Sequence, residues 1–139
     1  MSYSLYIDAV NDFTNRFVKP IAHQIDEEET FPADTVKQMG LHGLMGIPFS
    51  QTYGGMGSTT KAYVDAVRIL SQSCATTGVI LSAHTSLGTH PIDAFGTEEQ
   101  KKKYLPKLCS GEYLGAFGLT EAGAGTDASM QTTKAVDHG

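Results

Sequence analysis

The sequence predicts a mainly α-helical protein: a bundle of about six helices over residues 1–112, followed by the first strands of a β domain over 113–139. Up to Gly111, apolar residues recur at steps of three and four, the period of a helix packed on a core. Beyond Gly111 the period becomes two, as in a strand. With 40% hydrophobic and 18% charged residues, the composition is that of a globular chain.

The first half of the predicted bundle contains three helices and a long loop. Apolar spacing places the first helix over residues 5–18. Pro20 fits the first turn of the second helix, because the N–H that proline lacks would have no helical partner there. The third helix is expected to end at Gly40, a favourable C-cap. The Gly-rich run 41–57 then predicts a loop, and long loops in compact domains are often functional.

The second half of the bundle is expected to contain its central helix. Ser58 is predicted to cap a helix over 59–73. The segment 76–87 is apolar around almost its whole circumference, which predicts the central, buried helix. A short helical turn over 90–96 is followed by a last helix, for which Thr97 is the expected N-cap.

Two strands are expected at the end of the chain. Apolar and small residues alternate over 113–120, and the run 129–136 is rich in residues that favour strands. Two strands alone are marginally stable in water. We therefore expect a truncated β domain, completed by residues beyond Gly139.

Charge and hydropathy argue against nucleic acid and membrane as partners. The formal net charge is −5, and Lys101–Lys103 is the only basic cluster. No apolar run approaches the roughly 18 residues that span a bilayer, and the N-terminus carries acids where a signal peptide or presequence carries bases. These features predict a cytoplasmic protein.

Cysteines and histidines do not predict a metal or redox centre. Cys74 and Cys109 are isolated and lack the CxxC spacing of such sites, so we expect reduced thiols. His84 and His90 are not spaced as a helical ligand pair, and packing or surface roles are expected for both.

The turn after the first predicted strand is the main candidate site. Gly123 and Gly125 remove side chains where the backbone turns tightly or approaches a ligand, and exposed N–H groups there could bind an anion. A tight turn that joins two strands and binds no ligand explains the same glycines equally well. Residues 123–128 also fit a degenerate GxGxxA dinucleotide fingerprint, but no helix is expected to follow them. The GK[ST] of a triphosphate-binding loop is missing.

Three motifs resemble those of the flavin-dependent acyl-CoA dehydrogenases in their order and spacing. They are YGGMG at 53–57, FGTEEQKKKYLPKLCSGE at 95–112 and FGLTEAGAGTD at 117–127. The third motif is the most specific, and the sequence around it looks most like that of the short-chain or butyryl-CoA members. Ala122 and Thr126 are mild departures, since the family often has Pro or Ser in this turn.

The resemblance implies an enzyme that binds FAD and oxidises an acyl-CoA to a trans-2-enoyl-CoA. In that family a glutamate of the C-terminal domain takes the α proton, and the β hydride passes to flavin N5. The resemblance thus implies no catalytic residue within this chain, and the base is expected beyond Gly139. It also implies electron-transferring flavoprotein as a partner and a homotetramer as the full-length assembly.

Residue by residue, the resemblance implies cofactor contacts from the third motif. The backbone of Leu119 and the hydroxyl of Thr120 would bond the flavin ring, and Phe117 would pack along the same strand. Gly125 and Thr126 would lie against the pyrophosphate and the CoA portion of the substrate. Glu121 and Asp127 could suggest a carboxylate pair for acid–base chemistry, but we expect both to stabilise the turn.

A second set of residues is assigned to the acyl tail by the same resemblance. It consists of Val79, Ile80 and Ala83, on consecutive turns of the predicted central helix. Plain core packing is the alternative for all three.

Other functions stay open. An acyl-CoA oxidase or a flavin-dependent monooxygenase would share this scaffold, and a non-catalytic helical interaction module would share its composition. For the 139-residue chain alone we expect no dehydrogenase activity and weak or absent FAD binding.

Overall fold

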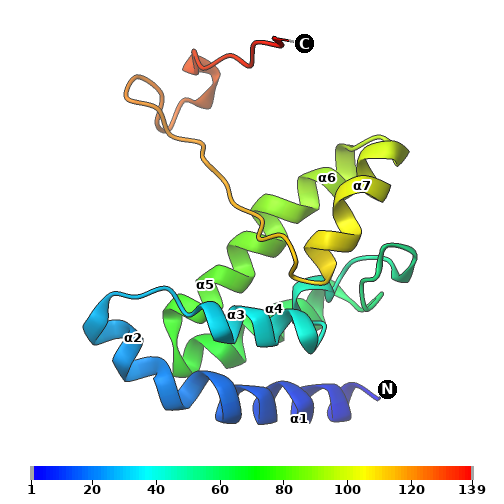
Figure 1. Ribbon diagram of the computed structural model, residues 1–139, viewed down its shortest axis with the longest axis vertical. Coiled ribbons are helices and arrows are strands. Elements are labelled where there is room, and N and C mark those ends of the chain that lie inside the picture. The colour runs from blue at the N-terminus through cyan, green and yellow to red at the C-terminus, as the bar shows by residue number, and fades with distance from the viewer. Residues whose placement is uncertain (1, 139) are drawn as a thin grey trace.

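The computed structural model describes residues 2–138, and a helical body forms most of it (Figure 1). The predicted helical bundle is confirmed. Its α-helices are α1 (Tyr3–Phe13), α2 (Ala22–Glu28), α3 (Ala33–Leu41), α4 (Thr60–Ser73), α5 (Ala75–Ser82), α6 (His90–Phe95) and α7 (Glu98–Cys109).

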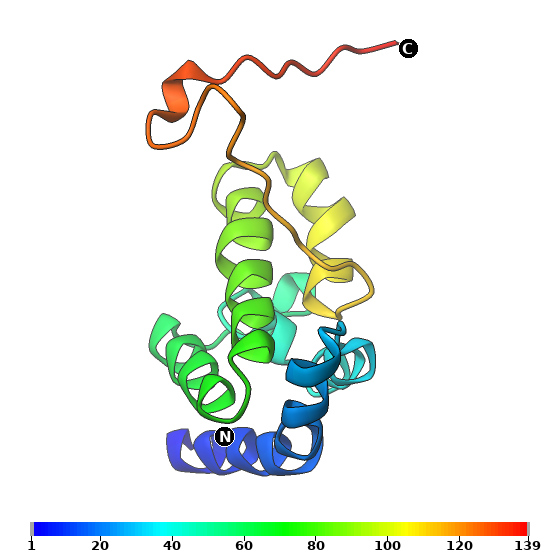
Figure 2. The same cartoon turned by 90° about the vertical axis from the view of Figure 1, so that its left-hand side faces the viewer.

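Two π-helical segments extend α-helices of the body. Thr14–Val18 continues α1, and Ala83–Thr89 joins α5 to α6. The second makes α5 and α6 into one column, and α1 lies across the lower end of that column in Figure 2. Wider π turns are frequent at functional sites.

The core lies where α1, α4 and α5 meet, together with the loop that follows α3. Tyr6 on α1 donates a hydrogen bond of 2.8 Å from its hydroxyl to the carbonyl of Ala62 on α4, which satisfies a buried polar group. Fully buried side chains include Met39, Met45, Ile47, Leu70, Leu81 and Leu105.

The α4–α5 packing depends on a glycine. A Cβ at Gly78 of α5 would lie 1.9 Å from Oγ and 2.9 Å from Cβ of Ser71 on α4. The two helices therefore approach more closely than any side chain at position 78 would allow.

The Gly-rich loop has a structural role in the core. Met45, Ile47 and Phe49 are buried, so this loop covers the end of the bundle. Gly54 has a φ of 81°, and a Cβ at Gly55 would lie 2.2 Å from the Phe49 carbonyl. Both positions thus require glycine.

Helix caps follow the sequence in part. The helix α3 ends at Leu41 with His42 as its C-cap, and not at the predicted Gly40. Thr97 caps α7 in a full capping box with Gln100. At α4 the cap is Thr59 and not the predicted Ser58, because the Thr59 hydroxyl accepts the hydrogen bond from Ala62 N–H. The prediction was one residue early.

The column of α5 and the π-helical segment is less buried than predicted. Val79 is 63% exposed and Leu87 is 45% exposed. Thr77, Gly78 and Leu81 of α5 are buried, so the expected burial of the central helix holds for one side only.

The segment after α7 leaves the helical body, as the orange-to-red part of Figure 1 shows. The strands expected over 113–120 and 129–136 are not formed within the described residues, where an isolated antiparallel bridge joins Glu121 to Ala124. The backbone there is irregular or extended, but a strand also needs a hydrogen-bonded neighbour.

Candidate functional site

The predicted cofactor residues lie on the segment that leaves the helical body. Phe117 is 52% exposed and Leu119 is 41% exposed, and Thr120 is also exposed. Large apolar side chains are exposed here next to polar ones, an arrangement typical of a surface that binds another molecule.

The segment leaves the body at Gly115, which is held at two points. Its N–H donates a hydrogen bond of 2.9 Å to Nδ1 of His84 in the π-helical segment. Its backbone also contacts that of Gly88, where a Cβ would lie 2.6 Å from Gly115 Cα. The backbones of Gly88 and Gly115 thus cross in contact, with no room for a side chain between them. This contact fixes the point at which the segment leaves the body.

Glu121 closes the candidate site into a loop. One carboxylate oxygen accepts hydrogen bonds from the N–H of Thr132 at 2.9 Å, and the other from the N–H of Thr133 at 3.0 Å. These hydrogen bonds lower the pKa of Glu121 to about 2. The bond from the Thr132 backbone has the largest effect, followed by the bonds from Thr133. A carboxylate that stays ionised in this way is poorly suited to proton transfer at neutral pH.

Asp127 has a similar local role. Its carboxylate accepts hydrogen bonds from the N–H of Ser129 at 3.0 Å and from the Ser129 hydroxyl at 2.5 Å. Both acids thus stabilise the turn, as expected from the sequence.

The turn presents polar groups that have no partner within the described residues. A Cβ at Gly123 or Gly125 would meet no atom within 4 Å, and neither backbone N–H donates a hydrogen bond there. The hydroxyls of Thr120 and Thr126 have no hydrogen-bond partner among the described residues, and both side chains are exposed. Donors of these kinds suit a pyrophosphate and the polar edge of a flavin ring.

The predicted acyl-tail residues lie apart from that turn. Val79 is exposed, whereas Ile80 packs partly against the core and Ala83 is half-buried. Val79 is nine residues before Gly88, or roughly 13 Å along the helix axis at 1.5 Å per residue. Val79 therefore lies well away from the crossing of Gly88 and Gly115, whereas Ala83 is the neighbour of His84, which bonds Gly115.

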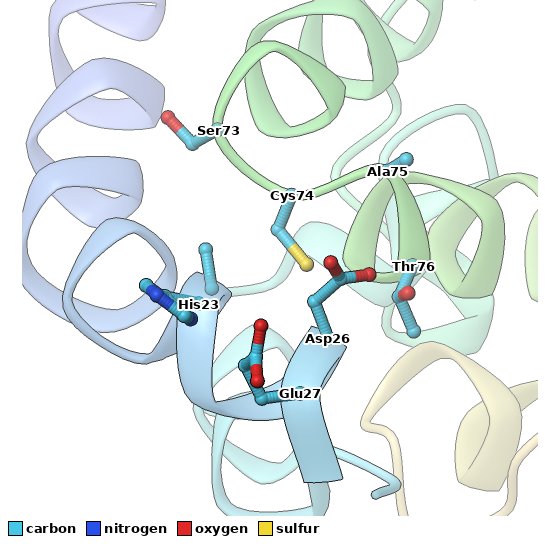
Figure 3. Close-up of a pocket in the computed structure, with 8 residues that line it drawn as sticks. His23, Asp26, Glu27, Ser73, Cys74, Ala75 and Thr76 are labelled. Carbon is cyan, nitrogen blue, oxygen red and sulfur yellow. The ribbon is translucent and has the colours of Figure 1, made fainter. Parts of the chain in front are cut away.

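A cavity of about 490 Å³ lies elsewhere, between α2 and the start of α5. Figure 3 shows Cys74 directed toward the helix that carries His23 and Asp26. The sequence does not predict this cavity, because its two sides come from segments about fifty residues apart and no motif marks either of them.

Residues 2–138 contain neither a metal cluster nor a membrane-spanning helix. No group of three or more His, Cys, Asp or Glu side chains in that range is placed to hold a metal ion. No helix in the same range has the length and apolarity needed to cross a membrane.

His84 is the site residue that the sequence did not reveal. A packing role was expected, and the side chain is indeed fully buried. Its partner Gly115 is 31 residues away, so no local pattern marks the pair.

Residues 3–112 match the family model described as "Acyl-CoA dehydrogenase, N-terminal domain". The chain is 57% identical over 130 residues to the short-chain-specific acyl-CoA dehydrogenase of Clostridium acetobutylicum, covering 94% of this chain and 34% of the relative. The chain thus spans about a third of the length of that relative.

Solved structures share the fold. Butyryl-CoA dehydrogenase from Megasphaera elsdenii matches with a TM-score of 0.88 at 36% identity, covering 96% of this chain and 36% of that one. An acyl-CoA dehydrogenase from Bacillus anthracis, in complex with FAD, matches with a TM-score of 0.83 at 34% identity, covering 91% and 22%. The helical body, the segment after it and the family match together show that this chain belongs to the acyl-CoA dehydrogenase family.

Proposed function

We propose that this chain supplies the N-terminal helical domain, residues 1–112, and the first flavin-binding segment, residues 113–139, of an FAD-dependent acyl-CoA dehydrogenase. The observation that carries the proposal is the segment 117–126 of this chain, which belongs to the family. In this segment two threonine hydroxyls have no hydrogen-bond partner among residues 2–138, and no atom lies within 4 Å of the place of a Cβ at Gly123 or Gly125. The substrate class is a short-chain acyl-CoA, supported by the 57% identity to a short-chain-specific relative.

Each residue of the segment has a proposed role. Thr120 and the backbone of Leu119 hold the polar edge of the flavin ring, and Phe117 packs beside it. Thr126 and the Gly125 N–H hold the pyrophosphate and the CoA portion of the substrate. Support comes from the exposure of these groups and from the chemistry of their donors.

FAD, when bound, supplies the hydride acceptor of the reaction. The chain's own contribution is to orient the cofactor, because a hydroxyl fixed near flavin N5 favours the charge that develops there. The base that takes the α proton is proposed to lie outside residues 1–139. Electron-transferring flavoprotein as acceptor and a homotetramer as assembly complete the proposal, and both follow from the family resemblance.

Thr120→Ala tests the central role in the full-length protein. We expect FAD to bind about tenfold more weakly, because one hydrogen bond to a polar ring edge is lost. Thr120→Ser retains the hydroxyl and should remain close to the parent. The measurement is a flavin fluorescence titration of the apoprotein, and an unchanged dissociation constant in Thr120→Ala would contradict the assignment.

The 139-residue chain alone is a second test. We expect no acyl-CoA-dependent dye reduction and no flavin absorbance after purification, since most of the cofactor's surroundings are provided by other parts of the relatives. Turnover by this chain would refute the proposal that the base lies elsewhere.

The full-length protein also separates the rival functions. Oxygen consumption with acyl-CoA would indicate an oxidase or monooxygenase on the same scaffold. A full-length protein that binds no flavin would indicate a helical interaction module.

A further inference from the structure

We propose that His84 is a positioning residue, whose neutral imidazole fixes Gly115 and thereby sets the path of residues 117–120 toward the cofactor. The hydrogen bond itself is independent of the proposed function, whereas its consequence for flavin binding rests on that function.

The first support is the hydrogen bond from Gly115. The His84 side chain is fully buried, and its Nδ1 accepts the Gly115 N–H at 2.9 Å. A backbone N–H can only donate, so Nδ1 carries no proton and the neutral ring has its proton on Nε2. Burial also lowers the pKa of His84, which favours the same neutral form.

The second support is the environment of Nε2. Backbone groups of Met45 and Leu108 partly oppose the lowering of the His84 pKa by burial. Thr89 Oγ1 lies 3.4 Å from Nε2 and itself donates to the His84 carbonyl at 2.8 Å. The ring thus joins the end of its own π-helical segment to the segment that leaves the body.

The third support is the glycine crossing beside the ring. A Cβ at Gly115 would lie 3.1 Å from the His84 carbonyl and 3.1 Å from Gly88 Cα. The φ of Gly115 is not positive, so glycine is needed here for close approach and not for a special backbone conformation. The histidine bond and the glycine contact hold the same residue.

The distance between Gly115 and Thr120 makes the position of Thr120 sensitive to the orientation of the chain at Gly115. Thr120 follows Gly115 by five residues, about 17 Å in an extended chain at 3.3 Å per residue. A rotation of roughly 15° at Gly115 would move Thr120 by about 4 Å, whereas misplacement by about 1 Å can reduce a rate a hundredfold. A small loss of order at the crossing is therefore amplified at the cofactor.

Amide hydrogen exchange of the 139-residue chain tests the bond without any cofactor. In His84→Leu the Gly115 amide should exchange at least about tenfold faster than in the parent, while the amides of α4 remain unchanged. In His84→Asn, Oδ1 occupies the place of Nδ1, so protection of Gly115 should be retained. His84→Gln carries its amide at the place of Nε2 and should lose that protection.

Nitrogen NMR of the parent chain keeps the test decisive if a variant fails to fold. The His84 ring should show an unprotonated Nδ1 and a protonated Nε2 at neutral pH. A protonated Nδ1, or equal Gly115 exchange in the parent and in His84→Leu, overturns the proposed bond.

Flavin titration of the full-length apoprotein tests the consequence. We expect FAD affinity about tenfold lower in His84→Leu, and recovery in His84→Asn. Equal affinity in the parent and in His84→Leu, with Gly115 exchange accelerated, overturns the positioning role. If no variant binds flavin but Gly115 exchange responds as expected, the proposed function fails and the His84–Gly115 bond stands.

Discussion

Individual side chains in the candidate site stabilise its shape. Glu121 and Asp127 each accept hydrogen bonds from residues a short way along the chain, and His84 accepts one from Gly115. All three are titratable groups of the kind often suspected of catalysis. Their partners include backbone N–H groups of this chain, so at the residue scale these side chains hold the backbone of the candidate site in place.

The pKa of Glu121 gives a prediction at this scale. Because its pKa in the folded chain is about 2, against an ordinary 4.5, the stabilisation from its hydrogen bonds is fully present above pH 4.5 and is lost as the pH falls through about 2. A carbon NMR titration of the Glu121 carboxyl should give a midpoint near 2. A Glu121 midpoint near 4.5 would contradict the hydrogen bonds from Thr132 and Thr133.

At the scale of elements, close packing between helices determines which residues the helical body tolerates. Glycine inside a helix normally lowers stability by about 0.5–1 kcal/mol relative to alanine. Gly78 in α5 is nonetheless required, since Ser71 of α4 occupies the space where a Cβ would lie. The packing of these two helices outweighs the intrinsic preference of one residue.

Gly78→Ala tests that packing. We expect the free energy of unfolding to fall by about 1–3 kcal/mol, because the added methyl group overlaps the Ser71 side chain. Ser71→Gly in the same chain should restore part of the loss. Gly123→Ala, where a Cβ meets no atom within 4 Å, is the matched control and should change stability little. Urea unfolding of the four chains gives the comparison.

At the scale of the whole molecule, a packed helical body is followed by an exposed segment. Leu119, Met130 and Val136 are each at least 41% exposed, although large apolar side chains are usually buried. None of the residues in the buried core cluster lies beyond Gly115, whereas α1, α3, α4 and α5 all contribute to it.

Limited proteolysis tests this division. Cleavage should occur first within residues 116–138, and the helical body should persist as a stable product ending close to Gly115. Thr97→Ala, which removes a helix cap inside the body, should lower stability by about 1 kcal/mol without changing the first cleavage site. Initial cleavage within α4 or α5 would contradict the division.

Helices were predictable from the sequence because their signals are local. The spacing of apolar residues and the capping group of Thr97 act within a few positions. Ser58 and Thr59 are adjacent hydroxyl residues that offer equivalent caps, so the pattern alone does not separate them. The strands could not be predicted in the same way, since alternation shows that a segment can pair but not that a neighbour is in place.

The candidate site was predictable only in part. Gly123 and Gly125 mark a turn, but the residues alone left a plain turn and a dinucleotide fingerprint as alternatives, and only the resemblance favoured a flavin. The His84–Gly115 bond was beyond sequence reasoning, because it joins residues 31 positions apart. Exposure of Val79 depends on which surfaces are covered, and its own apolar character predicts the opposite.

The π-helical segment Ala83–Thr89 has a consequence for how this chain can change in length. The hydrogen bond of a π turn spans one residue more than that of an α turn, so this segment already accommodates one extra residue within the helix. Deleting one residue there would restore a regular helix and leave α5 and α6 in nearly the same relative orientation, whereas a deletion within a regular α-helix rotates its two parts by about 100°. Single-residue insertions and deletions should consequently be tolerated in the exposed turn at 122–125 and, within this column, best in the π-helical segment.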